Sequence, residues 1–240
     1  MITLVENNAF PAIEPKGTIA GRLLSWWKAY GKHPQIAQFY KDERGGCAVL
    51  VDGQAVLVCG TDDSRKEFSA FFSLRKDIQN IYTDITTAEF FGLPFSCVQV
   101  MRCEESIPSQ PLLSSAPKEI YDVLSTIFAD FSAFEPWYLD VSYRMRHNLC
   151  HQTSGRKYDI LGSTAMTVAD WEGGALLGLV ATLPEYRRCG YAAQCVLSLA
   201  AFCQQAGKTV YISPKNETAK RLYTSLGFKD FEKIALIERK

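Results

Sequence analysis

The sequence lacks an excess of charge of either sign. Its 240 residues include 26 Lys and Arg against 26 Asp and Glu, so the formal net charge at pH 7 is zero. Such a chain has no overall positive field that would attract nucleic acid or an anionic membrane. We therefore expect neither partner and favour a small molecule or peptide.

Long apolar runs are also missing. No stretch approaches the roughly eighteen uninterrupted apolar residues of a membrane-spanning helix, and Met1–Glu6 lacks the basic start and apolar run of a secretory signal. Hydrophobic residues make up 47% of the chain and charged residues 22%, which is the balance of a globular protein with a substantial core. We expect a cytoplasmic protein.

Metal-binding patterns are scarce. The eight cysteines are widely spread without a Cys-x-x-Cys pair, and in a reducing compartment such cysteines are small buried apolar residues. His147 and His151 lie four residues apart in a predicted helix, but no third ligand accompanies them at a suitable spacing. We expect no metal and no structural disulfide.

The first part of the chain predicts alternating helices and strands. Asp52-Gly53 between two apolar runs is a two-residue hairpin signal. Ser106–Pro117, rich in Ser and Pro, is the predicted linker. We place one domain over residues 1–110 and a second over 118–240. The predicted elements of the first are helices over 21–30, 64–74 and 87–91 and strands over 47–59, 78–85 and 95–103.

The second part predicts a mixed α/β sheet. Residues 175–183 are almost wholly apolar, which suits a central strand covered on both faces. The helix over 191–205 is apolar nearly all round and must be buried. Further predicted elements are helices over 118–131, 137–151 and 217–226 and strands over 164–171, 209–213 and 228–238.

A polar turn joins the apolar strand to the buried helix. It reads Arg187-Arg188-Cys189-Gly190-Tyr191-Ala192, and successive N–H groups and the positive end of the helix dipole converge there. Gly190 allows close approach to the backbone, Ala192 keeps the first helical turn narrow, and the arginines add charge. The turn therefore predicts phosphate binding, with Cys189 incidental to it.

A second pattern follows downstream, Asn216-x-x-Ala219-x-x-x-Tyr223-x-x-x-Gly227-Phe228. Together the two patterns resemble the GNAT superfamily of N-acetyltransferases, over roughly residues 119–238. The resemblance implies an α/β fold with a mixed, mostly antiparallel sheet, splayed central parallel strands and flanking helices. It also implies acetyl-CoA as cosubstrate.

The resemblance further implies which residues bind the cofactor. Pantetheine would lie between the strands over 176–182 and 209–213 and pair with one of them as an added strand would. The expected cofactor-binding residues are Val180, Ala181, Thr182, Arg187, Arg188, Cys189, Gly190, Tyr191, Ala192, Ala193 and Asn216. Asn216 could equally be only a helix N-cap.

In this chemistry a neutral amine attacks the thioester directly, once both are held in place. We expect the Val180 N–H to stabilise the oxyanion, and Tyr223 to act as the acid, although Tyr223 could instead be only a core residue. The base is not evident, because residues 175–178 carry no carboxylate. Asp170, Glu172, His147 and a water chain remain open.

The first part echoes the second in the order of its elements, and residues 88–93 look like a shortened form of 219–228. However, its loop over 61–66 has no internal glycine and carries two carboxylates that would repel CoA. We interpret residues 1–110 as a degenerate GNAT-like half or an accessory domain, in a possible tandem arrangement.

The predicted function is an N-acyltransferase acting on an amine of a small molecule or peptide. The alternative is a catalytically silent acyl-CoA-binding sensor or assembly module, and a homodimer is an option in either case.

Overall fold

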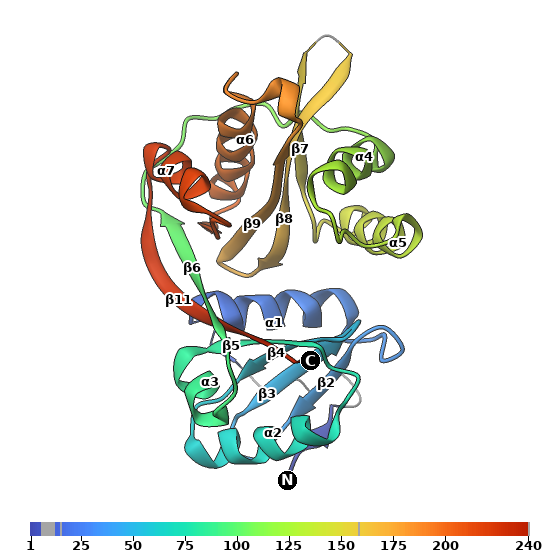
Figure 1. Ribbon diagram of the computed structural model, residues 1–240, viewed down its shortest axis with the longest axis vertical. Helices are drawn as coiled ribbons and strands as arrows, with labels where there is room; N and C mark the ends of the chain where they lie inside the picture. The colour runs from blue at the N-terminus through green and yellow to red at the C-terminus, as the bar shows by residue number, and fades with distance from the viewer. Residues whose placement is uncertain (6–12, 15, 158, 240) are drawn as a thin grey trace. The chain divides into compact units, whose positions relative to one another are not determined.

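The computed structural model describes residues 1–5, 13–14, 16–157 and 159–239, which fold into two units (Figure 1). Unit 1 comprises Met1–Val100 and Phe231–Lys240, and unit 2 comprises Met101–Asp230. Two strands, β6 (Ser96–Cys103) and β11 (Phe228–Glu238), each begin in one unit and end in the other.

These limits differ from the boundary placed on the sequence. Ser106–Pro117, the predicted linker, lies within unit 2, and Phe231–Lys240, assigned to the second domain, lies in unit 1. Backbone pairing explains the second difference, because Ile234–Glu238 pairs antiparallel with the strand over Asn80–Asp84. Strand pairing of this kind joins residues that are distant in sequence.

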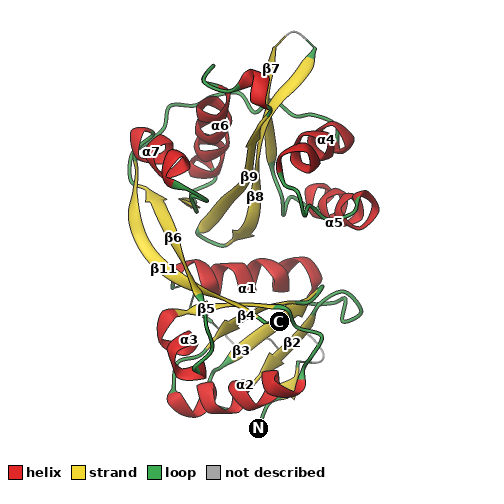
Figure 2. Ribbon diagram, viewed as in Figure 1, coloured by secondary structure: helices red, strands yellow, loops and turns green. Residues whose placement is uncertain are grey.

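Unit 1 is a sheet with helices on both faces. Its strand order is β1-β2-β3-β4-β5-β11, in which β4 and β5 run parallel and the other neighbours antiparallel. Helix α1 covers one face, and α2 and α3 cover the other (Figure 2). These elements are β1 (Thr3–Leu4), α1 (Gly17–Tyr30), β2 (Gln38–Lys41), β3 (Cys47–Val51), β4 (Gln54–Val58), α2 (Asp62–Leu74), β5 (Asn80–Asp84) and α3 (Ile85–Phe91).

Unit 2 repeats this plan. Its strand order is β6-β10-β9-β8-β7, with β9 and β10 parallel and the other neighbours antiparallel. Helices α6 and α7 lie on one face and α4 and α5 on the other (Figure 2). Its elements are α4 (Pro117–Ile127), α5 (Phe134–Arg146), β7 (Gln152–Lys157), β8 (Ile160–Trp171), β9 (Gly174–Thr182), the 3-10 turn η1 (Pro184–Tyr186), α6 (Tyr191–Gln205), β10 (Thr209–Ile212) and α7 (Glu217–Ser225).

The observed fold confirms the predicted class. The sheet of each unit is mixed and mostly antiparallel, and each contains a parallel pair flanked by helices. Helix α6 has the predicted limits, and its Val196 and Leu199 are fully buried. Asp52 and Gly53 have φ of 45° and 70°, as a two-residue hairpin requires. Within the described residues, no helix combines the length and hydropathy needed to cross a membrane.

The helix predicted to run to His151 ends at Arg146. Asn148 has a φ of 55°, and a left-handed residue just beyond the last turn ends a helix. His147 and His151 therefore do not share a helical face. His151 instead directly precedes β7, a strand of polar residues that hydrophobic patterning did not predict.

Candidate functional site

The sheet of unit 2 opens between its two parallel strands. Strands β9 and β10 pair only from Gly174 opposite Thr209 to Leu177 opposite Ile212. Strand β10 ends there, whereas β9 continues to Thr182. In the described part of the chain, the remaining edge of β9 therefore has no partner in β10, and its backbone groups can pair with an extended ligand.

A β-bulge lies on this open part of β9. Thr164 pairs with Ala181 and Met166 with Gly178, so Leu179 and Val180 together stand opposite one residue of β8. The φ of Leu179 is 48°, a conformation that costs a non-glycine residue on the order of 1–3 kcal/mol. A bulge turns the backbone out of the ladder, so the Val180 peptide is out of register with β8.

The two bulge residues face opposite sides of the sheet. Leu179 packs against the apolar cluster beneath α4 and α5, and Val180 packs against the cluster beneath α6 and α7. The latter cluster also contains Tyr223. The structure thus brings the two predicted catalytic residues into one cluster.

The predicted phosphate-binding turn follows η1. Both Arg188 and Gly190 have positive φ, 61° and 83°, and left-handed residues of this kind arrange backbone N–H groups into an anion-binding concavity. A Cβ built on Gly190 would meet no atom within 4 Å, so the space beside it is open. The first N–H groups of α6 have no intrahelical acceptor, because every helix leaves its first turn unpaired.

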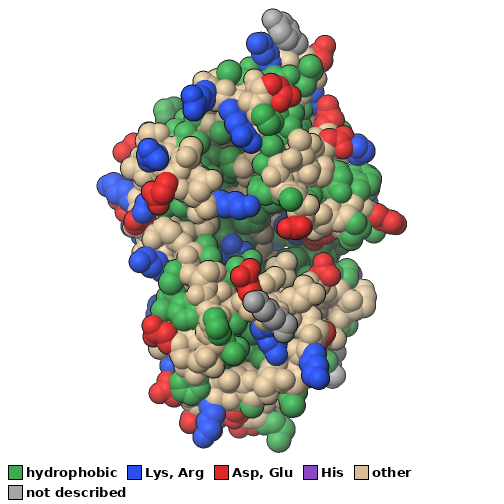
Figure 3. Space-filling model, in the orientation of Figure 1, with side chains coloured by type: hydrophobic (Ala, Val, Ile, Leu, Met, Phe, Trp, Pro, Cys, Tyr) green, Lys and Arg blue, Asp and Glu red, His purple; other side chains and the backbone are tan. Residues whose placement is uncertain are grey.

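The charges at this turn complement an anion. Arg187, Arg188 and Cys189 are exposed, while Tyr191 is half-buried at the start of α6. The Nε of Arg187 donates to the Thr182 carbonyl oxygen at 3.2 Å, which ties the turn to the end of β9. Figure 3 displays an apolar hollow on this face of unit 2, with several Lys and Arg side chains and also acidic side chains near its rim. The arrangement suits a phosphate group at a helix N-terminus.

Helix α7 supplies the other two predicted residues. The side-chain oxygen of Asn216 accepts a hydrogen bond from the Ala219 N–H at 2.9 Å, so Asn216 is the N-cap. Tyr223 is 5% exposed, and its ring centroid lies 6.2 Å from that of Phe228. Burial raises the pKa of Tyr223 to about 12, so its phenol is protonated and can donate at neutral pH.

Two of the candidate bases lie far from the bulge. Asp170 is fully buried, forms an ion pair with Lys208, and pairs across the sheet with Ala175. Glu172 is exposed in the turn before β9. Because a strand rises roughly 3.3 Å per residue, the six steps from Gly174 to Val180 span about 20 Å. Neither carboxylate can take a proton beside Val180.

His147 lies at the end of α5 and is exposed. Its Nδ1 is 2.8 Å from the Tyr143 carbonyl oxygen, an acceptor, so Nδ1 carries the proton when the ring is neutral. In that tautomer Nε2 is the acceptor and can bind a proton.

The parallel pair of unit 1 ends differently, because β4 and β5 each end two residues after their last pair. The Thr83 hydroxyl donates to the Leu57 carbonyl oxygen at 3.0 Å, which continues the contact between β4 and β5 past their last paired residues. Arg65 Nε donates to the Thr87 hydroxyl at 3.1 Å and links α2 to α3. Thr61 caps α2 by accepting from the Ser64 N–H at 3.2 Å.

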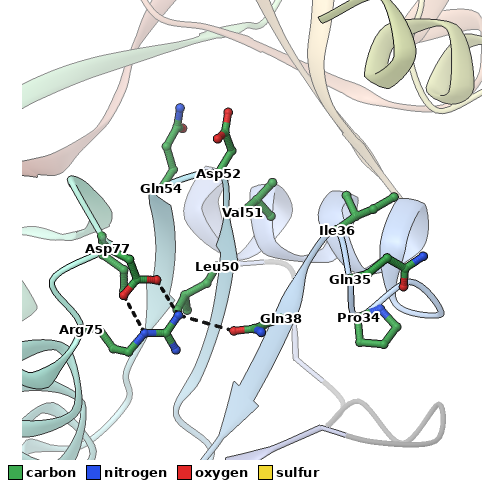
Figure 4. A pocket seen from close by; sticks show the side chains of 12 residues that line it. Pro34, Gln35, Ile36, Gln38, Leu50, Val51, Asp52, Gln54, Arg75 and Asp77 are labelled. Atoms are coloured by element: carbon green, nitrogen blue, oxygen red, sulfur yellow. Dashed lines mark hydrogen bonds and ion pairs between the residues drawn. The ribbon is translucent and has the colours of Figure 1, made fainter. Parts of the chain in front are cut away.

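A separate pocket of unit 1 lies beside the β3–β4 turn (Figure 4). Arg75 lines the pocket and carries a positive charge. Its Nη2 is 2.7 Å from an oxygen of Asp77, and its Nη1 is 3.1 Å from the Tyr40 hydroxyl. The guanidinium is thus held by protein groups, and we do not assign this pocket a ligand.

Part of the chain is similar in sequence to a known protein family. Residues 162–236 match the protein-family model described as FR47-like protein. A search of curated protein sequences finds no match.

Solved structures show the same fold over nearly the whole chain. A GNAT-family protein from Novosphingobium aromaticivorans is 18% identical, with a TM-score of 0.60 over 92% of this chain and 99% of that one. A GNAT-family acetyltransferase from Colwellia psychrerythraea is 10% identical, with a TM-score of 0.61 and full coverage of both chains. A tandem GNAT protein from the clavulanic acid biosynthesis pathway is 10% identical, with a TM-score of 0.58 over 96% of this chain and 90% of that one.

Proposed function

Because the chain has the GNAT fold and its C-terminal region matches the FR47-like family, we propose that unit 2 is an acyl-CoA-dependent N-acyltransferase. It moves an acetyl group from acetyl-CoA to an amine of a small molecule or peptide. The observation that carries the proposal is the bulge at Leu179 and Val180, which lies where β9 has parted from β10. We infer that the bulge turns the Val180 N–H toward an acyl thioester lying along this edge.

The cofactor has a continuous path along unit 2. Pantetheine pairs with the edge of β9 over Val180–Thr182, and the pyrophosphate lies at the turn Arg187–Gly190 and on the N–H groups of the first turn of α6, Tyr191–Ala193. The amide nitrogen of Asn216 contacts the pantetheine arm while its oxygen caps α7. The end of β10 at Ile212 supports the pantetheine assignment, and the first turn of α6, which has no intrahelical acceptor, supports the pyrophosphate assignment.

The reaction proceeds by direct attack of the neutral amine on the thioester carbonyl. The oxygen of the tetrahedral intermediate becomes negative, and the Val180 N–H donates to it. Tyr223, with a pKa of about 12, is a weaker acid than a thiol of pKa about 8.5, so complete proton transfer to the departing thiolate is uphill. The phenol therefore acts by donating a hydrogen bond to the sulfur, and the final proton comes from the nitrogen of the former amine.

A base must still remove the first proton from the acceptor, which enters as an ammonium of pKa near roughly 10. With Asp170 and Glu172 excluded by distance, Nε2 of His147 or a chain of water molecules performs this step. No metal takes part in the proposed chemistry.

We assign unit 1, which comprises residues 1–100 and 231–240, a role without CoA, as a degenerate GNAT-like half or an accessory domain. The link from Thr83 to Leu57 and the link from Arg65 to Thr87 support this assignment. So does the parallel pair β4–β5, which occupies the place in unit 1 that β9–β10 occupies in unit 2.

The proposed location is the cytoplasm. All eight cysteines are free, which fits a reducing compartment. The proposed partners are acetyl-CoA and the amine, without nucleic acid or membrane, and a homodimer is compatible with them.

One observation favours a second function, a catalytically silent acyl-CoA-binding module. The strand before the bulge, Ala175–Gly178, carries no carboxylate that could act as a base. The two functions separate in one experiment, in which calorimetry measures CoA binding and a thiol reagent follows CoA release from acetyl-CoA with mixed amines. Binding with amine-dependent thiol release supports the enzyme. Binding without release supports the silent module, and absence of binding contradicts both.

A further inference from the structure

We propose that two glycines of the β7–β8 hairpin, Gly155 and Gly162, are positioning residues for the pyrophosphate turn and act through Tyr191 and Tyr186. The inference rests on the proposed function, because it concerns how unit 2 binds the CoA pyrophosphate. Neither glycine touches the turn itself, which spans Arg187–Gly190. Each instead receives the aromatic ring that flanks one end of it.

Tyr186 lies directly on the backbone of Gly162. A Cβ built on Gly162 would lie 2.5 Å from Cγ of Tyr186, a distance that real Cβ atoms essentially never show, and 3.0 Å from its Cβ. Rotation of the ring about the Cβ–Cγ bond moves neither atom. A larger residue at position 162 therefore requires Tyr186 to change its χ1 rotamer or η1 to move away from β8.

The backbone of Gly162 is also distorted so as to receive η1. Gly155 pairs with Ser163 and Arg156 with Leu161, so Gly162 is the extra residue of a β-bulge. Its carbonyl oxygen accepts a hydrogen bond from the Leu183 N–H at 2.9 Å. The bulge thus fixes both the end of β9 and the ring that precedes the turn.

Tyr191 lies on Gly155 in a similar way. A Cβ on Gly155 would lie 3.0 Å from Cδ1 and 3.2 Å from Cβ of Tyr191, and 3.5 Å from the sulfur of Cys195. The two tyrosine rings meet edge to face, with centroids 6.2 Å apart at 66°. The ends of the turn are therefore held close together on neighbouring strands.

Holding both ends matters because the turn between them contains two left-handed residues, Arg188 and Gly190. Such conformations persist only when the surrounding structure fixes them. A turn that is already formed binds its ligand more tightly, since binding then loses less conformational entropy. The two glycines therefore act on donor affinity rather than on the chemical step.

The test compares acetyl-CoA with acetyl-pantetheine, which lacks the pyrophosphate. Gly162→Ala should weaken acetyl-CoA binding on the order of tenfold or more, with kcat at saturating acetyl-CoA within about twofold of wild type. Its kcat/KM with acetyl-pantetheine should be unchanged, because that donor does not reach the turn. Gly60→Ala is the matched control, since a Cβ at position 60 meets nothing within 4 Å and its φ is not positive.

Variants of Tyr186 complete the experiment. Tyr186→Phe keeps the ring and should bind acetyl-CoA as wild type does, whereas Tyr186→Ala should reproduce the loss. Both substitutions break the same contact, the one between Gly162 and Tyr186. The double variant Gly162→Ala, Tyr186→Ala should therefore bind acetyl-CoA no more weakly than the weaker-binding single variant. Tyr186→Ala removes atoms instead of adding them, so it makes the same test if Gly162→Ala does not fold.

If the wild-type protein binds CoA, two results would overturn this inference and leave the proposed function intact. One is wild-type affinity for acetyl-CoA in folded Gly162→Ala and Tyr186→Ala. The other is an equal loss with acetyl-CoA and acetyl-pantetheine, which would indicate general distortion of unit 2. A wild-type protein that binds no CoA would instead overturn the proposed function and, with it, this inference.

Discussion

The hydroxyl of Thr83 donates to the carbonyl oxygen of Leu57 at 3.0 Å and holds β4 and β5 together just beyond their last paired residues. In unit 2, β9 continues five residues beyond its last pair with β10, from Leu177 to Thr182. In unit 1, β4 and β5 each end two residues after their last pair. Their ligand-binding properties should differ accordingly.

We therefore predict one CoA site per chain. Calorimetric titration of the full chain with CoA should give a stoichiometry close to one, since in unit 1 the strands β4 and β5 each end two residues after their last pair and Thr61 caps α2. A value near two would show that unit 1 also binds CoA.

Gly190→Glu should abolish CoA binding. The new side chain extends into the open space beside Gly190, places a carboxylate in the pyrophosphate path and strains a residue whose φ is 83°. Calorimetry gives the affinity, and circular dichroism checks folding. Gly60→Glu is the matched control, because it adds the same charge at an equally open position of unit 1. Unchanged CoA affinity in folded Gly190→Glu would rule out the turn as the pyrophosphate site.

Tyr223→Phe should lower kcat on the order of 10²-fold while leaving acetyl-CoA affinity nearly unchanged. Phenylalanine keeps the ring that packs in the α6 cluster, so only the hydrogen bond to the departing sulfur is lost. Steady-state kinetics and a melting temperature separate this effect from misfolding. Full turnover in the folded variant would mean that the thiolate leaves without help from Tyr223.

Ionisation of the Tyr223 phenol should not lower kcat at any pH below about 11. The protonated phenol is the active form, and burial raises its pKa from 10.0 to about 12, so the raised pKa extends the active range upward. The rising limb of the profile belongs to deprotonation of the acceptor and its base. A falling limb near pH 10 that disappears in Tyr223→Phe would show that the phenol titrates as an ordinary tyrosine.

Two substitutions of Asn216 separate its roles as cap and ligand. Asn216→Ser retains an N-cap oxygen but not the amide nitrogen, so it should raise KM for acetyl-CoA with little change in melting temperature. Asn216→Ala loses both and should also destabilise the protein by about 1 kcal/mol. If Asn216→Ser has wild-type kinetics, Asn216 is only a cap.

Elements with strong local signals could be predicted from the sequence. The apolar pattern of α6, bounded by Gly190 and Gly207, matches its observed limits, and Asn216 marks the start of α7. Strand β7 could not be found in this way, because Gln152–Lys157 is polar and is buried by contacts with distant segments. The Ser154 N–H, for example, donates to the Leu113 carbonyl oxygen at 2.8 Å.

The sequence predicts which residues belong to the candidate site, but not the backbone conformation that they adopt. Its glycines and polar residues stand out in the sequence, whereas the φ of 48° at Leu179 does not, because leucine rarely adopts it. Gly155 and Gly162 give no local signal either, since their function depends on tyrosines that follow at a distance in sequence. The pairing of β11 with β5 depends on long-range registration, which short sequence patterns do not encode.

That pairing sets an order of events during synthesis. The outer edge of β5 receives Ile234–Glu238, so it stays unpaired while the ribosome translates all of unit 2. For this interval an unpaired strand edge is available to other nascent chains, which is a route to aggregation. Unit 2 has its β6 partner early and can fold first, so the half that is made first should be the last to become resistant to proteases.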